Sequence, residues 1–385
     1  MLGSAPVVAN AGAIGRRSAS IPPKELARTL RSWYDRHART LPWRRDRDPY
    51  RIWVAEVLLQ QTRVAQALPY YRRFLGRFPD VRTLARARGS TVLRYWAGAG
   101  YYGRARNLHA AARVVVADRR GRIPDTVEGL RELPGVGPYI ASAVASLAFG
   151  RPTLALEANG LRVAARLTGE EEDVRTAAVR RRLARFLEGG VSRHGSGEYN
   201  EALMEFGEVV CRPLRPDCPR CPLAGRCRAR QEFPDPSVLP RRGRRPRRPH
   251  LYAAIALLEY RGRWLVQRRP PKGLLGGLWE FPGGHIEKDE NPREACRREL
   301  KEEVGVSPRE LSPLGVVRHT YSHFSVDLHV YHARLGPSEA ARVRPSADRR
   351  WVNRSAFARI PKPRATEKAA DLLTGDRPGR LSRGS

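Results

Sequence analysis

Apolar residues follow helical spacing along roughly the first 230 residues and alternate with a period of two farther along the chain. The segment "PPKELARTLRSWYDRHA" (22–38) has proline at its start, and "TVLRYWAGAG" (91–100) is closed by glycines, as is typical of helix boundaries. Strand-like alternation is nearly absent between residues 23 and 229. This part of the chain is therefore predicted to be all-α.

The pattern changes after residue 250. Two apolar segments, "HLYAAIALLEY" (250–260) and "RWLVQRR" (263–269), flank the turn residues Arg261 and Gly262, which predicts a β-hairpin. The segment "SVDLHVYHA" (325–333) alternates with period two, and "NPREACRRELKEEVGV" (291–306) is typical of a helix. These elements predict a second, smaller α+β domain at 250–375.

The segment between the two predicted domains and the two ends of the chain differ from them in composition. Residues 229–249 are dense in proline and arginine and are predicted to be a linker. Residues 1–22 and 376–385 are expected to be tails, and the first lacks the arrangement of a secretory signal. The chain is thus a multi-domain protein, for which we expect a cytoplasmic, nucleoid-associated location and a monomeric state.

The net charge of +33 and the pI near 11.2 require a polyanionic partner. Nucleic acid is the first candidate. A membrane surface is the weaker one, because no long apolar span and no amphipathic helix with a purely basic face is present.

Four of the five cysteines lie within "CRPLRPDCPRCPLAGRC", in the spacing C-x6-C-x2-C-x5-C: Cys211, Cys218, Cys221 and Cys227. Four thiolates so close in sequence can surround one metal centre, either zinc or a [4Fe-4S] cluster, and bare thiols are the remaining alternative. The spacing resembles the iron–sulfur loop of the endonuclease III superfamily of DNA glycosylases, which implies a [4Fe-4S] cluster.

The segment "ELPGVGPYIASAVASLAFG" (132–150) predicts a helix, a tight turn and a second helix. Gly135 and Gly137 allow a sharp turn that directs backbone N–H groups outward at a helix N-terminus, where a phosphate binds well. The segment resembles the helix-hairpin-helix signature of the same glycosylases. Tyr139 stands where lyase members carry a lysine nucleophile, and a phenol cannot form a Schiff base.

Residues 23–228 resemble the MutY family of adenine DNA glycosylases through "LPWRRDRDPYRIWVAEVLLQQTRV", "AGAGYYGRARNLH", "LPGVGPY", "NEALMEFG" and the cysteine loop. The resemblance implies an all-α helix-hairpin-helix glycosylase domain. A six-helix module would span about 46–149, and an iron–sulfur module would comprise 23–45 and 150–228. The predicted partner is double-stranded DNA with adenine opposite 8-oxoguanine or guanine.

Glu56 falls where this family keeps its general acid. It lies in the apolar run "WVAEVLLQQT", so two interpretations compete: a glutamate on the exposed stripe of a helix, or one whose pKa is raised in an apolar pocket. Glu157 falls where the family has aspartate in a D-G-N run, here Glu157-Ala158-Asn159, and is one methylene longer. It is predicted to stabilise the cationic sugar as the glycosidic bond breaks.

The resemblance implies further roles. Tyr139 and Asn159 would lie near the reacting sugar, and Arg44, Trp43 and Glu201 would contact adenine. The predicted DNA-binding residues are Gln61, Thr62, Tyr101, Leu133, Gly135, Val136 and Gly137.

The segment from Gly284 to Val306 satisfies the Nudix pattern G-x5-E-x7-R-E-U-x-E-E-x-G-U completely, where U is a bulky aliphatic residue. Glu299, Glu302 and Glu303 would share one helix face and are candidate ligands of Mg²⁺. The family ends in a Nudix-like domain that recognises 8-oxoguanine, for which Tyr321, Ser322 and His323 match its F-S-H loop. The box therefore represents a scaffold remnant, a structural Mg²⁺ site or a working nucleotide hydrolase.

The sequence thus predicts a DNA glycosylase that releases adenine and leaves an abasic site. The alternatives are an endonuclease III-like glycosylase/lyase for damaged pyrimidines, a lesion-binding protein without activity because of Glu157, and a DNA-tethered nucleotide hydrolase.

Overall fold

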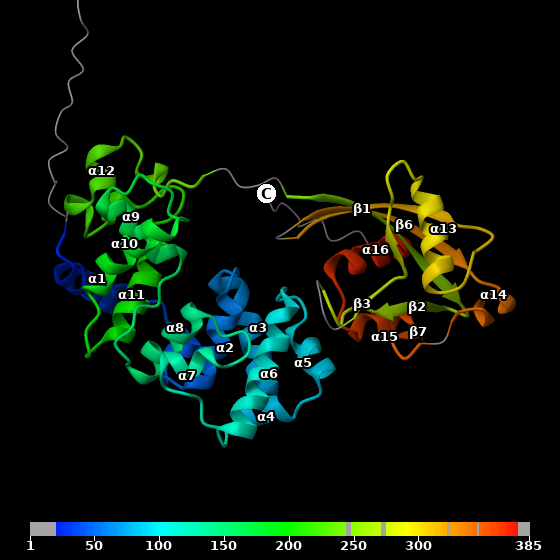
Figure 1. Ribbon diagram of the computed structural model, residues 1–385, viewed down its shortest axis with the longest axis horizontal. Coiled ribbons are helices and arrows are strands. Elements are labelled where there is room, and N and C mark those ends of the chain that lie inside the picture. Colours follow the sequence, from blue (N-terminus) through cyan, green and yellow to red (C-terminus); the bar gives the residue numbers. More distant parts are fainter. Residues whose placement is uncertain (1–20, 244–247, 271–274, 322–323, 345, 376–385) are drawn as a thin grey trace, which may run out of the picture. The chain divides into compact units, whose positions relative to one another are not determined.

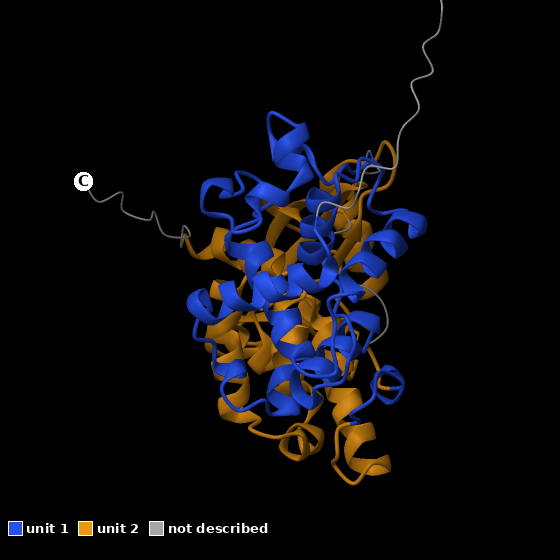
Figure 2. Cartoon of the chain, turned by 90° about the vertical axis from the view of Figure 1, so that its left-hand side faces the viewer, with its two compact units in different colours: residues 1–52, 124–132, 136–244 blue, residues 53–123, 133–135, 245–385 orange. Residues whose placement is uncertain are grey.

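The computed structural model describes residues 21–243, 248–270, 275–321, 324–344 and 346–375. A series of helices leads up to α12, and the strands lie in the later part of the chain (Figure 1). The chain forms two compact units, residues 1–52, 124–132 and 136–244 in one, and residues 53–123, 133–135 and 245–385 in the other (Figure 2). The helix at 138–149 therefore belongs to the first unit, although the sequence placed it in one module with residues 53–123.

The described residues up to 243 contain helices and no strand, as predicted. The α-helices are α1 Pro23–His37, α2 Pro49–Leu59, α3 Val64–Arg77, α4 Val81–Arg86, α5 Gly89–Trp96, α6 Tyr102–Asp118, α7 Val127–Arg131, α8 Pro138–Phe149, α9 Ala158–Thr168, α10 Ala177–Glu188, α11 Ser196–Val209 and α12 Arg228–Glu232. The short 3-10 helices are η1 Pro42–Arg44, η2 Cys218–Arg220, η3 Ala224–Arg226 and η4 Pro236–Val238.

The core of the first unit is formed by apolar stripes of α1, α9, α10 and α11. Leu26, Leu30 and Trp33 on α1 follow the helical repeat and are buried together with Leu183 of α10 and Phe206 of α11. Three of the clustered cysteines pack against this core. The cysteine loop is therefore packed against the core that these four helices form.

The second unit contains a seven-stranded sheet, in which β1 and β2 form the predicted hairpin. The remaining elements are β1 His250–Tyr260, β2 Arg263–Arg268, β3 Trp279–Glu280, β4 Gly283–His285, α13 Pro292–Glu303, β5 Ser312–Thr320, β6 Ser325–Arg334, α14 Pro337–Ala341, β7 Arg349–Val352, α15 Arg354–Arg359 and α16 Arg364–Thr374. The strand order is β3-β2-β1-β6-β5, with β4 paired to β1 and β7 paired to β2. The neighbours β1 and β6 are parallel, although about 65 residues separate them in sequence.

Both faces of this sheet are covered by helices. Alternate residues of β1 point to opposite faces, so they pack in two different clusters. Ala254, Ala256 and Leu258 pack on one side with Cys296 of α13, and Leu257 packs on the other side with residues of α15 and α16. A strand buried on both faces has a continuous apolar run, as β1 does. The predicted fold, an all-α part and an α+β Nudix-like domain, is confirmed.

The first half of the segment predicted to be a linker packs against the helical part of the chain. Leu239 is fully buried, and its carbonyl oxygen accepts a hydrogen bond from Nε of the buried Arg166. The backbone N–H of Gly243 donates to Asp173. Proline and arginine content therefore did not prevent this segment from packing.

Candidate active site

Glu56 lies in α2, and its neighbours in sequence from Trp53 to Leu58 are all buried. Glu56 itself is only 3% exposed. The interpretation that Glu56 occupies an exposed helix stripe is therefore wrong. The carboxyl group of Glu56 is therefore held away from bulk water.

Gln61 and Tyr101 both have left-handed backbone conformations, with φ of 62° and 48°. Such φ values are uncommon outside glycine and often mark functional sites. Gln61 follows the end of α2, and Tyr101 is the N-cap of α6 and is 41% exposed. Thr62 is half-buried, and its N–H donates to Leu59 O at 3.2 Å.

The predicted hairpin lies between α7 and α8. Gly135 has φ of 75°, and a Cβ at this position would meet the Asn107 side chain at 2.4 Å, so only glycine fits. Gly137 is the N-cap of α8, with proline next to it. Leu133 and Val136 are buried, so the hairpin presents backbone rather than these side chains.

Glu157 is the N-cap of α9, and its Oε1 accepts a hydrogen bond from the N–H of Asn159 at 2.9 Å. Burial raises the pKa of Glu157, while the helix N–H groups and the Arg162 guanidinium act in the opposite direction. Arg162 also donates to Asn159 Oδ1 at 2.6 Å and, through Nε, to Cys211 O at 2.8 Å. A single buried guanidinium thus connects the loop of Glu157 to the cysteine loop.

Arg44 and Glu201 are brought together, with Arg44 Nε 3.5 Å from Glu201 Oε1. Arg44 also donates from Nη2 to Glu205 at 2.9 Å, and Glu205 is paired with Arg39. Burial raises the pKa of Glu201, whereas the two arginines hold the pKa of Glu205 below its usual value. Trp43 is buried beside Arg44 in η1.

Glu205 and Arg162 were not among the site residues predicted from the sequence. Their positions contain a signal, because Glu205 lies four residues after Glu201 and Arg162 lies three residues after Asn159. Residues at these spacings share one helix face. Tyr139 is half-buried, and its hydroxyl lies 3.7 Å from Met204 Sδ.

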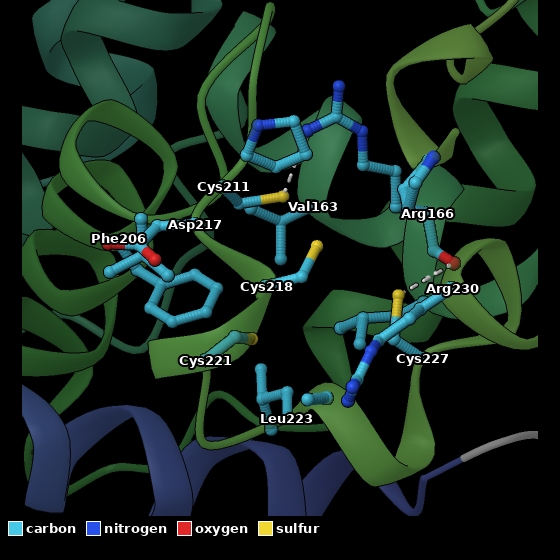
Figure 3. A pocket seen from close by; sticks show the side chains of 15 residues that line it. Val163, Arg166, Phe206, Cys211, Asp217, Cys218, Cys221, Leu223, Cys227 and Arg230 are labelled. Atoms are coloured by element: carbon cyan, nitrogen blue, oxygen red, sulfur yellow. Dashed lines mark hydrogen bonds between the residues drawn. The ribbon is translucent and has the colours of Figure 1, made fainter. Parts of the chain in front are cut away.

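The four clustered cysteines line one cavity, together with apolar side chains such as Phe206 and Leu223 (Figure 3). Burial raises the pKa of Cys218, Cys221 and Cys227, that of Cys221 to about 12. Arg166 Nη1 lies 3.4 Å from Cys211 Sγ. Thiolates in such a cavity need a compensating positive charge, and the Arg166 guanidinium supplies one beside Cys211.

The carboxylates of the Nudix box are engaged within the protein. Arg298 pairs with Glu290, Glu299 and Glu302, and Glu303 accepts from Gln267 Nε2 and the N–H of Gly283. Among the residues that the structure describes, no group of three or more His, Cys, Asp or Glu is arranged to hold a metal ion. The expected Mg²⁺ site at Glu299, Glu302 and Glu303 therefore receives no support.

Tyr321 stacks on Phe324, with ring centroids 4.7 Å apart, and contacts His319 edge-on at 4.5 Å. Ser322 and His323 lie outside the described residues. Within the second unit, Tyr321 and Tyr101 line the same cavity, along with Arg94, Arg106 and Lys362. This lining of aromatic and basic groups is suited to a nucleic-acid strand.

The helix-hairpin-helix, the cysteine loop and the Nudix-like domain together define a class, the base-excision DNA glycosylases with a Nudix domain. Residues 54–188 match the model of the HhH-GPD superfamily base excision DNA repair proteins, and residues 253–372 match the NUDIX domain model. The chain is 35% identical to the adenine DNA glycosylase of Homo sapiens, over 91% of this chain and 74% of that protein. It is also 35% identical to the adenine DNA glycosylase of Mus musculus, over 91% of this chain and 78% of that protein.

The chain belongs to the adenine DNA glycosylase family. Among solved structures it is similar to a thermostable thymine-DNA glycosylase, with a TM-score of 0.50 and 29% identity over 55% of this chain and 97% of that one. The protein is thus an enzyme of base-excision repair. None of the helices within the described ranges has the length and apolar character needed to cross a membrane.

Proposed function

We propose that this enzyme hydrolyses the N-glycosidic bond of adenine placed opposite 8-oxoguanine or guanine in duplex DNA, and that it leaves an abasic site. The observation that carries the proposal is the burial of Glu56, with 3% of its surface exposed, in a helix of apolar residues. A protonated carboxyl group there can act as a general acid at neutral pH.

In this mechanism Glu56 donates its proton to N7 of the extruded adenine. The bond between the sugar C1′ and N9 then breaks, and its electron pair leaves with the base. Water adds to C1′ and gives a proton back to Glu56, so the products are adenine and an abasic deoxyribose. Glu157, held by the N–H of Asn159, supplies negative charge that stabilises the oxocarbenium ion.

The other proposed site residues contact the base, the sugar or the rest of the duplex. Arg44, Glu201 and Trp43 contact adenine, and Tyr139 and Asn159 lie near the sugar. Gln61, Thr62 and Tyr101 enter the base stack as adenine leaves it, a step that every duplex-acting glycosylase requires. The hairpin binds phosphate through its backbone at Leu133, Gly135, Val136 and Gly137.

Adenine release should be fastest opposite 8-oxoguanine, slower opposite guanine and slowest opposite thymine or cytosine. Single-turnover assays on the four duplexes measure this order. Tyr321→Ala should reduce the preference for 8-oxoguanine over guanine by about fivefold, since an aromatic contact contributes about 1 kcal/mol. Equal rates opposite all four bases would contradict the proposed specificity.

The same duplexes distinguish the proposed glycosylase from a glycosylase that also has lyase activity. Because Tyr139 cannot form a Schiff base, strands should break only after treatment with base or heat. Strand nicking without such treatment would instead favour an endonuclease III-like glycosylase/lyase.

We further propose that Cys211, Cys218, Cys221 and Cys227 hold a [4Fe-4S] cluster, which organises the surrounding loop and carries no step of hydrolysis. Cys221→Ser should lower the iron content of the purified protein and its visible absorbance. Cys296→Ser is the matched control, because Cys296 is buried in the other unit and should leave both unchanged. Full iron content in Cys221→Ser would contradict the assignment.

A further inference from the structure

The side chain of Arg104 joins two segments of the second unit that are about 40 residues apart in sequence. Its Nη1 donates to the carbonyl oxygens of Val57 at 2.8 Å and Leu58 at 3.0 Å, and also contacts that of Gln60. Its Nη2 donates to Ala99 O at 3.1 Å and Gly100 O at 3.4 Å. One guanidinium therefore binds both the C-terminal end of α2 and the loop before α6.

Each of these two segments is followed directly by a residue with a left-handed backbone conformation. Gln61 comes directly after Gln60, and Tyr101 directly after Gly100. The Arg104 guanidinium also lies over the Tyr101 ring, 5.1 Å from its centroid. Arg104 thus contacts both of the segments that carry these two side chains.

The contacts of Arg104 are unusual for a cation away from solvent. Burial lowers its pKa to about 10, so it stays protonated at neutral pH. Among the described residues, its hydrogen bonds go to backbone carbonyls, with no carboxylate among them. Carbonyls at a helix C-terminus have no intrahelical partner and carry partial negative charge, so a cation is favoured there.

A planar guanidinium can donate several hydrogen bonds in fixed directions, whereas a lysine ammonium has three donors on a flexible stem. An arginine is therefore suited to hold two backbone segments at a fixed separation, and a lysine is not. The arrangement needs no contact between Arg104 and DNA.

We propose that Arg104 is a positioning residue, which holds Gln61 and Tyr101 at the separation needed for both to enter the base stack when adenine is extruded. The inference rests on the proposed roles of these two side chains in extrusion. It adds a residue that acts through them and is distinct from the acid and the carboxylate of the chemical step.

The test compares Arg104→Lys and Arg104→Met in the full chain with Arg113→Lys, an exposed arginine of the same helix. Extrusion is followed by the fluorescence of 2-aminopurine beside the target adenine, and release by single-turnover assay. We expect Arg104→Lys to slow extrusion by on the order of 10- to 100-fold, the scale of a displacement of about 1 Å. Arg113→Lys should match the parent.

A second substrate separates positioning from general damage. An adenine opposite an abasic site is unpaired and costs less to extrude, so the defect of Arg104→Lys should shrink there. An equal defect on both substrates, or parent-like extrusion on the first, would overturn the inference. If Arg104→Met does not fold, the lysine variant still decides.

A double-mutant cycle provides an independent measurement. If Arg104 acts partly through Tyr101, the combined loss in the Arg104→Lys/Tyr101→Ala variant should be smaller than the product of the two separate losses, whereas independent effects would multiply. Failure of the proposed function is distinguishable, because the parent itself would then release no adenine. If the parent releases adenine and the cycle shows independent effects, only the inference on Arg104 fails.

Discussion

Glu56→Gln should reduce the single-turnover rate of adenine release by about 10³-fold while leaving affinity for the mismatched duplex unchanged. The amide has nearly the shape of the carboxyl group but cannot donate its proton to the base, and general acid catalysis contributes about 10²- to 10⁴-fold. Because Glu56 is buried in α2, its loss should not alter the surface that meets DNA. Fluorescence anisotropy with a non-cleavable duplex measures binding separately from chemistry.

Glu188→Gln is the control for this experiment. Glu188 is an exposed glutamate at the end of α10, so the same chemical change there should not alter the rate. A Glu56→Gln enzyme within tenfold of the parent would remove Glu56 from the catalytic role. Loss of duplex binding together with activity would point to structural damage instead.

The second large effect concerns the carboxylate at position 157. Glu157→Gln should lower the rate by about 10²- to 10³-fold, because a neutral amide cannot stabilise the cationic sugar. Glu157→Asp should be intermediate, with a loss on the order of 10- to 100-fold. Aspartate still caps α9 and keeps the charge, but its carboxylate sits about one methylene away from the position to which the surroundings are adjusted.

The pH dependence provides an independent readout of Glu157. Burial raises the pKa of Glu157, so this carboxylate is protonated at a higher pH than an ordinary glutamate as the pH falls. Activity should therefore be lost at a higher pH on the acidic side of the rate profile. Arg162 lowers that pKa, so Arg162→Met should move the acidic limb of the rate profile further toward neutral pH. A Gln variant as active as the parent would remove Glu157 from the mechanism, as would an acidic limb that does not respond to Arg162.

The local elements were largely predictable from sequence. The helix at α1, the β1–β2 hairpin, α13 and the turn between α7 and α8 follow from periodicity and turn residues, which act over a few neighbouring positions. The cysteine spacing and the Nudix pattern were also visible in the sequence. They indicated the class of protein before any contact between distant residues was known.

The partners of the buried polar groups could not be predicted in this way. Glu205 is 1% exposed on a helix whose sequence gives no reason to expect its pairing with Arg39, 166 residues away. The sequence gives equally little indication that Arg104 binds carbonyls of α2. Partners of this kind depend on which helices pack together, and a residue's own neighbours do not determine that.

The sequence by itself determined the all-α character of the first part, the β1–β2 hairpin and the helix α13, and which residue types are present for acid catalysis, phosphate binding and a metal centre. Only the tertiary structure decided that Glu56 is buried, because α2 is apolar almost all round and its sequence does not say which face is covered. It also decided the parallel pairing of β1 with β6 and the contacts of Arg104, Arg162 and Glu205. The physical reason is that backbone sterics and side-chain periodicity act locally, whereas a buried charge or carbonyl must find its partner wherever the packed chain provides one.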